Sequence, residues 1–504
     1  MERKSRMIQI LLFLLVSVFV LTALAGCKNN KEPEETEPPE ADTGGAYDKD
    51  GYLKDSLPNN LDYKFEGISI LGWNVDVTGV SEFDIKDMSG DEIEVSIFER
   101  DSAVEDRLKV ELFYTIAKGD SKNTATYKTT VQNSIHNGKP YDVIEGYTRS
   151  VAICATDGLL MDLGNLESSY LDFDAPWWNQ SIIEKTSVGN TFYFATGDIA
   201  PSFVQMLYCV HFNADLIESL SMQSPYEHVA NNTWTLETLM GMTMNFYDDV
   251  NTNNIKDLTD KIPLTGLYYD WPALLHGCGI GNMIKDDATD EFILDPALGG
   301  EKGLKIMEKL SAMVSLDNCF VGENDDINAS FIAEKNLFMV RESSLPIRKF
   351  SEVEFEYGCV PCPKYDSTQE NYISTARQPV TLVALSTGVK KARIEMISAT
   401  VEALASESYR SVTPIIFDRV MQYQKAASEE MRQMLILIRD TGWFDAGRIF
   451  AADISYLCDQ PGRVLQKYPT QTWESYVNGT LNTTVKAQVE KLNETLLKLA
   501  GQSK

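Results

Sequence analysis

The chain has 504 residues and a formal net charge of −29, because 74 acidic side chains outnumber 45 basic ones. Nucleic-acid binding needs clustered lysine and arginine to neutralise phosphates, so this composition excludes nucleic acid as a general partner. The length exceeds what one hydrophobic core supports, and we expect two or more domains.

The N-terminus has the pattern of a secretory signal. Residues 1–26 carry a basic start and an apolar run, and they end in Leu-Ala-Gly before Cys27. This order is typical of a signal peptide. The ending resembles a bacterial lipobox, which implies that Cys27 is lipidated and anchors the protein on the extracellular face of the cell membrane, as in Gram-positive lipoproteins. An uncleaved transmembrane anchor is the alternative that the length allows.

Residues 27–59 are predicted to form a disordered tether. Positions 28–50 are mostly Lys, Asn, Glu, Pro, Thr, Asp and Gly. Such a segment cannot bury enough apolar surface to fold. It would hold a folded body a short distance from the membrane.

Beyond the tether, apolar runs and helical periodicity alternate, which predicts parallel βαβ units. The predicted strands are 67–74, 111–115, 141–146, 203–212, 264–269, 336–341 and 380–385, and the predicted helices include 97–110, 127–137, 301–314, much of 389–440, and a C-terminal face of Val489, Leu492, Leu496, Leu497 and Ala500. Residues 191–200 read as a buried strand. Its Gly197-Asp198 pair is expected where the chain crosses between two lobes.

Six segments resemble, in order, motifs of the extracellular solute-binding proteins of ABC importers, above all the sugar-binding family that includes maltose-binding protein. They are YDVI at 141–144 with GLLMDL at 158–163, FYFA at 192–195, HFNADL at 211–216, TWTLETL at 233–239, FIAEKNLFM at 331–339 and VPCPK at 360–364. The chain departs from the family at 334–336, which lacks the family glycine, and at Cys359 and Cys362.

The resemblance implies an α/β, two-lobed periplasmic-binding-protein-like fold. Each lobe would be an open, mostly parallel sheet with helices on both faces, and a multi-strand hinge would join the lobes. Lobe one is expected at 60–197 and 372–440, lobe two at 200–364 and 441–504, with crossings near 198, 368 and 442. The implied function is the capture of a carbohydrate, expected to be an oligosaccharide, by a monomer that delivers it to ABC transporter permease subunits.

Enzyme signatures are scarce. The four histidines form no HExxH pair, and we find no GxSxG elbow, P-loop or dinucleotide fingerprint. We therefore predict no catalytic residues and no required cofactor. Two alternatives stay open: a secreted carbohydrate-active enzyme, and a ligand sensor for a membrane kinase.

The candidate ligand residues are aromatic and polar side chains near predicted strand ends and turns. Open α/β sheets bind ligands at the carboxyl ends of their strands, and sugars stack their C–H faces on aromatic rings. The candidates are Trp73, Asn74, Tyr147, Arg149, Trp177, Asp198, Asp270, Trp271, Arg341, Arg377 and Trp443. Core packing is the alternative for each tryptophan.

Residues 249–260 have the spacing of a calcium-binding loop. Oxygen-bearing side chains occupy positions 1, 3, 5, 9 and 12 of an EF-hand-like pattern; they are Asp249, Asn251, Asn253, Asp257 and Asp260. Asn254 stands where EF-hands carry glycine, and Asp260 has a shorter reach than the usual glutamate. We predict a structural Ca²⁺ ion of weak affinity, with a merely polar loop as the alternative.

Seven cysteines follow Cys27, an odd number without the spacing of a disulfide framework. The CxxC at 359–362 follows a strand-like stretch, whereas redox motifs of this kind open a helix. No second CxxC or histidine lies nearby to complete a zinc site.

Overall fold

The computed structural model describes residues 46–74, 82–324, 326–350 and 353–502. The predicted signal peptide, Cys27 and most of the predicted tether lie outside these residues. Residues 1–53 form a unit separate from 54–504, and its described part is a turn closed by an antiparallel bridge between Tyr47 and Leu53. Within the described ranges, every helix is too short or too polar to span a bilayer.

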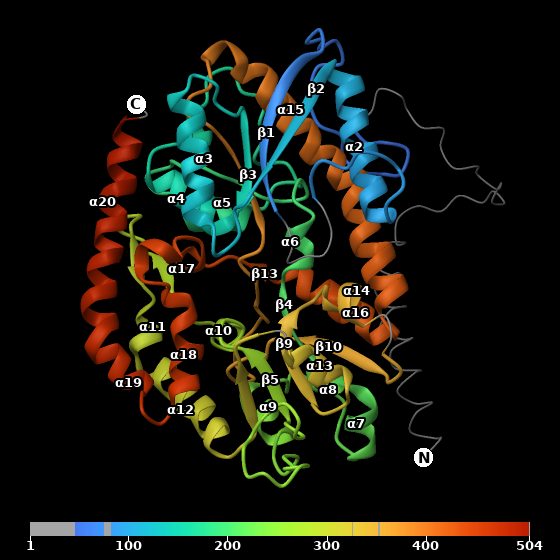
Figure 1. Ribbon diagram of the computed structural model, residues 1–504, viewed down its shortest axis with the longest axis vertical. Coiled ribbons are helices and arrows are strands. Elements are labelled where there is room, and N and C mark those ends of the chain that lie inside the picture. Colours follow the sequence, from blue (N-terminus) through green and yellow to red (C-terminus); the bar gives the residue numbers. More distant parts are fainter. Residues whose placement is uncertain (1–45, 75–81, 325, 351–352, 503–504) are drawn as a thin grey trace, which may run out of the picture. The chain divides into compact units, whose positions relative to one another are not determined.

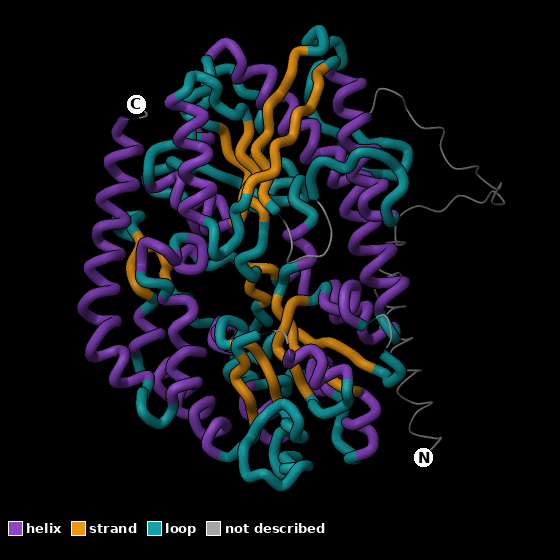
Figure 2. Tube along the Cα trace, viewed as in Figure 1, coloured by secondary structure: helices purple, strands orange, loops and turns teal. Residues whose placement is uncertain are grey.

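The first sheet has four strands in the order β12-β3-β1-β2 (Figures 1 and 2). Their bounds are β1 (Glu66–Trp73), β2 (Val110–Ala117), β3 (Val143–Tyr147) and β12 (Thr381–Leu385). The first three are parallel, and β12 runs antiparallel to β3 with Thr381 opposite Tyr147. Because parallel strands end at the same edge, Trp73 and Tyr147 lie on one edge of this sheet.

Local sequence explains the helix that joins β1 to β2. Asp91 caps α2 (Glu92–Leu108) by accepting the backbone N–H groups of Ile93 and Glu94, and the Glu94 side chain completes a capping box. The buried face of α2 lies at helical spacing. In Figure 1, α2 and α15 pair on one side of the sheet, and α3 and α4 pair on the other.

The second sheet has five strands in the order β10-β4-β9-β5-β8. Their bounds are β4 (Tyr208–Asn213), β5 (Leu264–Leu267), β8 (Cys319–Gly322), β9 (Phe338–Glu342) and β10 (Tyr357–Pro361). β5 is parallel to β8 and β9, whereas β4 is antiparallel to β9 and β10. This sheet is therefore mixed and not mostly parallel, because two of its four pairings are antiparallel.

Helical segments flank both sheets. In chain order their bounds are α3 (Thr124–His136), α4 (Thr148–Thr156), α5 (Gln180–Thr186), α6 (Ser202–Gln205), α7 (Ala214–Ser219), α8 (Pro225–Ala230), α9 (Leu236–Met242), α10 (Pro272–Gly277), α11 (Pro296–Gly299), α12 (Glu301–Ser315), α13 (Asp326–Ile332), α14 (Leu345–Lys349), α15 (Ile394–Glu407), α16 (Glu429–Asp440), α17 (Ala446–Ile449), α18 (Gln460–Lys467), α19 (Trp473–Tyr476) and α20 (Lys486–Gln502), with π-helical turns at Ser408–Val412, Ile415–Lys425 and Val477–Val485.

Connecting segments lie side by side between the sheets. β11 (Ser374–Thr375) pairs in parallel with β13 (Gly442–Trp443), and Ala376 bridges Leu207. The run 191–200, predicted as a strand, is instead an irregular buried segment held by single bridges, one of them between Ala195 and Val383. A side chain at Gly197 would place its Cβ only 2.0 Å from the carbonyl oxygen of Trp177, so this position requires glycine.

Two helices in the second half of the chain connect regions that are far apart in sequence. α16 packs against β10 and α8 of the second sheet, although it lies in the range predicted for lobe one. α20 contacts both α4 and the β6-β7 hairpin (Met283–Lys285 and Phe292–Leu294). On α20 the predicted apolar face is buried except for Leu497, which is 41% exposed. The predicted lobe limits stay predictions.

All seven cysteines that follow Cys27 are buried and carry free thiols. Cys359 and Cys362 lie on and just after β10 and not at a helix start. Both belong to a continuous apolar cluster that reaches both sheets.

Candidate functional site

A cavity of about 340 Å³ lies where the edges of the two sheets meet. Residues from the first sheet and its loops, from the second sheet and from the connecting segment line it together: Trp73, Asp120, Ser121, Tyr147, Arg149, Tyr268, Tyr269, Arg341, Arg348, Lys349, Arg377, Gln378, Pro379 and Asp459. We call this cavity the interlobe pocket. Five of the eleven predicted ligand residues line it, namely Trp73, Tyr147, Arg149, Arg341 and Arg377.

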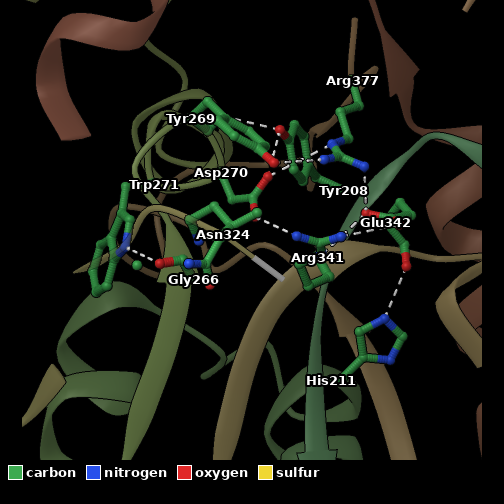
Figure 3. Close-up of polar contacts among 12 residues, drawn as sticks. Tyr208, His211, Gly266, Tyr269, Asp270, Trp271, Asn324, Arg341, Glu342 and Arg377 are labelled. Carbon is green, nitrogen blue, oxygen red and sulfur yellow. Dashed lines mark hydrogen bonds and ion pairs between the residues drawn. The ribbon is translucent and has the colours of Figure 1, made fainter. Parts of the chain in front are cut away.

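A cluster of three arginines around Glu342 forms one wall of the interlobe pocket, and Figure 3 shows two of them, Arg341 and Arg377. Glu342 is fully buried; its Oε2 lies 2.9 Å from Arg377 Nη1 and 3.3 Å from Arg341 Nε, and its Oε1 pairs with Arg348. Burial alone would raise the pKa of Glu342, but the three guanidinium groups outweigh it and hold that pKa well below its usual range.

Asp270 lies beneath the same arginines and does not line the pocket. Its Oδ1 accepts a hydrogen bond from Tyr208 Oη at 2.9 Å, and its Oδ2 accepts the Leu267 N–H at 3.1 Å. Arg341 and Arg377 lie 3.5 and 3.7 Å from its oxygens. Burial raises the pKa of Asp270 despite these cations. Asp270 therefore positions the arginines and is not free to contact a ligand.

Trp271 is not a stacking platform, which corrects its predicted role. Its side chain is fully buried, and Nε1 donates to the Gly266 carbonyl oxygen at 3.1 Å (Figure 3). β5 ends at Leu267, and the turn closed by Asp270 directs Trp271 back into the core. Tyr268 and Tyr269, which follow the strand immediately, line the pocket instead.

The two half-buried tyrosines supply the aromatic surface of the second lobe. Their ring centroids are 5.0 Å apart in an edge-on arrangement. Arg377 lies over the Tyr269 ring, 5.2 Å from its centroid, and donates to Tyr269 Oη at 3.2 Å. Arg463 lies 4.1 Å from the centroid of Tyr268. These contacts fix both rings at the pocket wall.

Arg149 lines the pocket on the first-lobe side and is paired with Asp459. It lies 3.2 Å from both carboxylate oxygens of Asp459 and 3.4 Å from Cys458 Sγ. Burial and Asp459 raise the pKa of Cys458 to about 12, so its thiol stays protonated. Trp73 donates from Nε1 to Thr381 Oγ1 at 2.9 Å and is 1% exposed, so it contributes little more than a ring edge.

Asn74 acts on the pocket through a neighbour. It donates from Nδ2 to Asp120 Oδ2 at 3.4 Å, and its Oδ1 accepts the Gly119 N–H at 3.0 Å. Asp120 lines the pocket, whereas Asn74 does not. Asn74 therefore positions the loop that carries Asp120.

Three further predicted ligand residues lie outside the interlobe pocket, which corrects their assignment. Trp177 is buried and donates from Nε1 to Glu402 Oε1 at 2.9 Å. Asp198 lies within the buried run 191–200, where its side chain is hydrogen-bonded to Thr413, and burial raises its pKa to about 6. Trp443 lies on β13 with its ring 5.3 Å from that of His276. Each of the three lies near a predicted turn in the sequence, but its side chain packs against residues outside the pocket.

The sequence-based prediction missed the other nine residues that line the interlobe pocket. Tyr268 and Tyr269 had a usable signal, because they directly follow an apolar strand. Arg348 and Asp459 had none, since α14 and the segment before α18 carry no strand-end pattern. Their place in the site depends on contacts with residues distant in sequence.

Several side-chain oxygens of the predicted calcium loop accept hydrogen bonds from the loop's own backbone. Asp249 accepts the backbone N–H groups of Asn253 and Asn254, and the Asn253 side chain accepts the Ile255 N–H. The described His, Cys, Asp and Glu side chains form no group of three that could hold a metal ion, so the three loop carboxylates do not cluster.

Comparison with known proteins addresses the fold. No protein-family model matches the sequence, and no curated protein does. Among solved structures, the ABC substrate-binding protein Lmo0181 from Listeria monocytogenes, in complex with cycloalternan, is 12% identical with a TM-score of 0.52, over 86% of this chain and 99% of that one. A cyclo/maltodextrin-binding protein complexed with maltotetraose is 13% identical with a TM-score of 0.52, over 86% and 96%.

A third structure agrees with these two. The GacH receptor of Streptomyces glaucescens, solved unliganded and with acarbose, is 14% identical with a TM-score of 0.52, over 86% of this chain and 99% of that one. The chain has the two-lobed fold of ABC-transporter sugar-binding proteins. The predicted resemblance and the α/β two-lobed fold class are thereby confirmed.

Proposed function

We propose that this protein captures a carbohydrate in the interlobe pocket and delivers it to the permease of an ABC transporter. The observation that carries the proposal is the pocket itself, whose aromatic and polar side chains come from both lobes of a fold that holds oligosaccharides in its solved neighbours. A ligand that contacts both lobes stabilises their closed arrangement, because only that arrangement offers both sets of contacts.

The pocket chemistry supports binding without catalysis. Glycoside hydrolysis needs two carboxyl groups that flank the substrate, one of them free to donate a proton. Here Asp459 is paired with Arg149, while Asp270 and Glu342 are buried among arginines. Asp120 accepts hydrogen bonds from two asparagines and the backbone. No hydrolysis of aryl glycosides is expected.

A thermal-shift screen over mono- and oligosaccharides tests the proposed function. Ligand binding to the folded state stabilises it by about 2.7 kcal/mol at a hundredfold excess over Kd. At least one saccharide should raise the melting temperature in a concentration-dependent way. A complete lack of response across a broad panel would contradict the proposal.

Tyr268→Ala should weaken saccharide binding about tenfold to a hundredfold, because it removes a stacking surface worth about 1–3 kcal/mol. Tyr268 is only partly buried at the pocket wall, so the melting temperature without ligand should change little. Calorimetry measures the affinity. Tyr423→Ala, which removes a tyrosine that is 73% exposed outside the pocket, serves as the matched control. Unchanged affinity in Tyr268→Ala would exclude this ring from the site.

We propose lipid anchoring through Cys27 on the basis of the N-terminal sequence. Cys27→Ser should release the protein from the membrane fraction or leave unprocessed precursor, because the acylated thiol is lost. Cell fractionation and metabolic labelling with a fatty acid measure the effect. Normal lipid labelling of the variant would contradict the assignment.

Calcium binding at residues 249–260 stays a proposal that rests on the spacing of its oxygens. Chelation with EDTA should lower the melting temperature, and Asp249→Ala should abolish that response, because Asp249 occupies the first position of the loop. If EDTA leaves the melting curve of the unaltered protein unchanged, the loop is a polar turn.

A further inference from the structure

The interlobe pocket is cationic in a strongly acidic protein. Five cationic side chains line it, against two carboxylates, whereas the whole chain carries a net charge of −29. The cations are Arg149, Arg341, Arg348, Lys349 and Arg377, and the carboxylates are Asp120 and Asp459. Composition alone would give the opposite sign, so this charge is a property of the site.

The counter-charges behind the wall do not cancel this excess. Asp270 and Glu342 together face three guanidinium groups, and Asp459 faces Arg149. With Asp270 and Glu342 added to the two carboxylates that line the pocket, one cation still remains in excess. Arg448 lies behind Gln378 and donates to its Oε1 at 3.1 Å.

The orientation of these groups matters more than their number. Asp270 and Glu342 lie beneath the arginines and do not line the pocket, so the second lobe presents donors to a ligand and keeps its acceptors covered. Arginine and lysine have donors only. Neutral sugars carry hydroxyl groups that both donate and accept, whereas a carboxylate or sulfate only accepts. The donor-rich wall is therefore matched to an anionic group.

We propose that the ligand is an anionic saccharide. Arg341, Arg377 and Lys349 would face its anionic oxygens, and the Tyr268 and Tyr269 rings would lie against the sugar. This inference rests on the proposed function and narrows it to one class of carbohydrate. Charge-assisted hydrogen bonds are roughly twice as strong as neutral ones, so a single anionic group would decide the selectivity.

Matched ligands test the proposal by calorimetry. Trigalacturonate should bind at least about tenfold more tightly than its methyl ester, which keeps the size and hydroxyl groups but loses the charges. Its affinity should fall as ionic strength rises from about 0.01 M to about 0.15 M, because the Debye length shortens. A sulfated chondroitin disaccharide and maltotriose complete the set and separate carboxylate, sulfate and neutral ligands.

The outcomes distinguish the two proposals. Binding of either anionic saccharide with weaker binding of the ester and of maltotriose supports an anionic ligand. If maltotriose or the ester binds as tightly as the acid, the anionic class is overturned and carbohydrate capture stands. If no member of the set and no saccharide in the wider thermal screen binds, both proposals fail.

A single-charge variant adds an independent readout. Lys349 lines the pocket on an exposed part of α14, so Lys349→Gln should leave the melting temperature unchanged. It should weaken acid binding about fivefold to tenfold and flatten the dependence on salt. Lys498→Gln removes the same charge from an exposed position on α20 and serves as the control. Equal affinity of both variants for the acid would remove Lys349 from the anion site, and a salt-independent affinity of the unaltered protein would overturn the proposal.

Discussion

Replacing Glu342 with glutamine should lower the free energy of unfolding by about 3–5 kcal/mol, the range measured when one partner of a buried ion pair is removed. Glu342 is fully buried and faces Arg341, Arg348 and Arg377. Without its charge, the three guanidinium groups repel one another in a poorly solvated wall. Urea unfolding, with a reductant present to keep the thiols reduced, measures the change.

The control is Glu237→Gln, which breaks an exposed pair with Lys309 and should cost less than about 1 kcal/mol. Similar losses in both variants would contradict the central role of Glu342. The pH dependence gives a second check. Because the pKa of Glu342 is lowered in the folded state, its stabilisation is complete above the pKa of the unfolded chain, about 4.3, and is lost as the pH falls toward the folded value.

Trp271→Ala should destabilise the protein by about 3–5 kcal/mol, because it leaves a large cavity in a packed core. The indole is fully buried and hydrogen-bonded to Gly266. The fraction that stays folded should bind saccharide with unchanged affinity, since the ring does not line the pocket. Chemical unfolding measures the first effect and calorimetry the second. Weaker binding with unchanged stability would place Trp271 in the ligand site after all.

Local patterns predicted several of the longer elements to within a few residues. The apolar runs predicted at 67–74 and 336–341 correspond to β1 and β9, and the helical periodicity at 301–314 corresponds to α12. These segments have a strong period and clear ends, so propensity and packing agree. At 203–212 the prediction was partly wrong, because its first residues form α6 and only Tyr208–Asn213 is a strand.

The end of β5 shows why the site was harder to predict than the fold. The apolar run Leu264–Tyr269 suggested a strand that ends at Asp270 and Trp271. The Asp270 side chain accepts the Leu267 N–H and closes the turn two residues earlier. Because the strand ends two residues earlier than predicted, Tyr268 and Tyr269 line the pocket, and Asp270 and Trp271 are buried. Propensity does not reveal such a turn, because it is set by contacts of Asp270 with arginines from two other segments.

Long-range pairs account for the residues that the sequence did not indicate. Arg149 and Asp459 are 310 positions apart, yet they form one wall of the interlobe pocket. Nothing in the segment around Asp459 identifies it as a ligand residue. Its role follows from the return of the C-terminal region to the first lobe, where α17 packs against α4.

The seven buried thiols have a consequence for the lifetime of the protein. In the folded state all of them are shielded, so dissolved oxidants have no access to them. Complete unfolding exposes all seven at once, and any disulfide formed among them is absent from the native structure. Oxidised chains cannot return to the native packing, so in an oxidising environment unfolding becomes irreversible. Persistence is then governed by the unfolding rate and not by the equilibrium free energy.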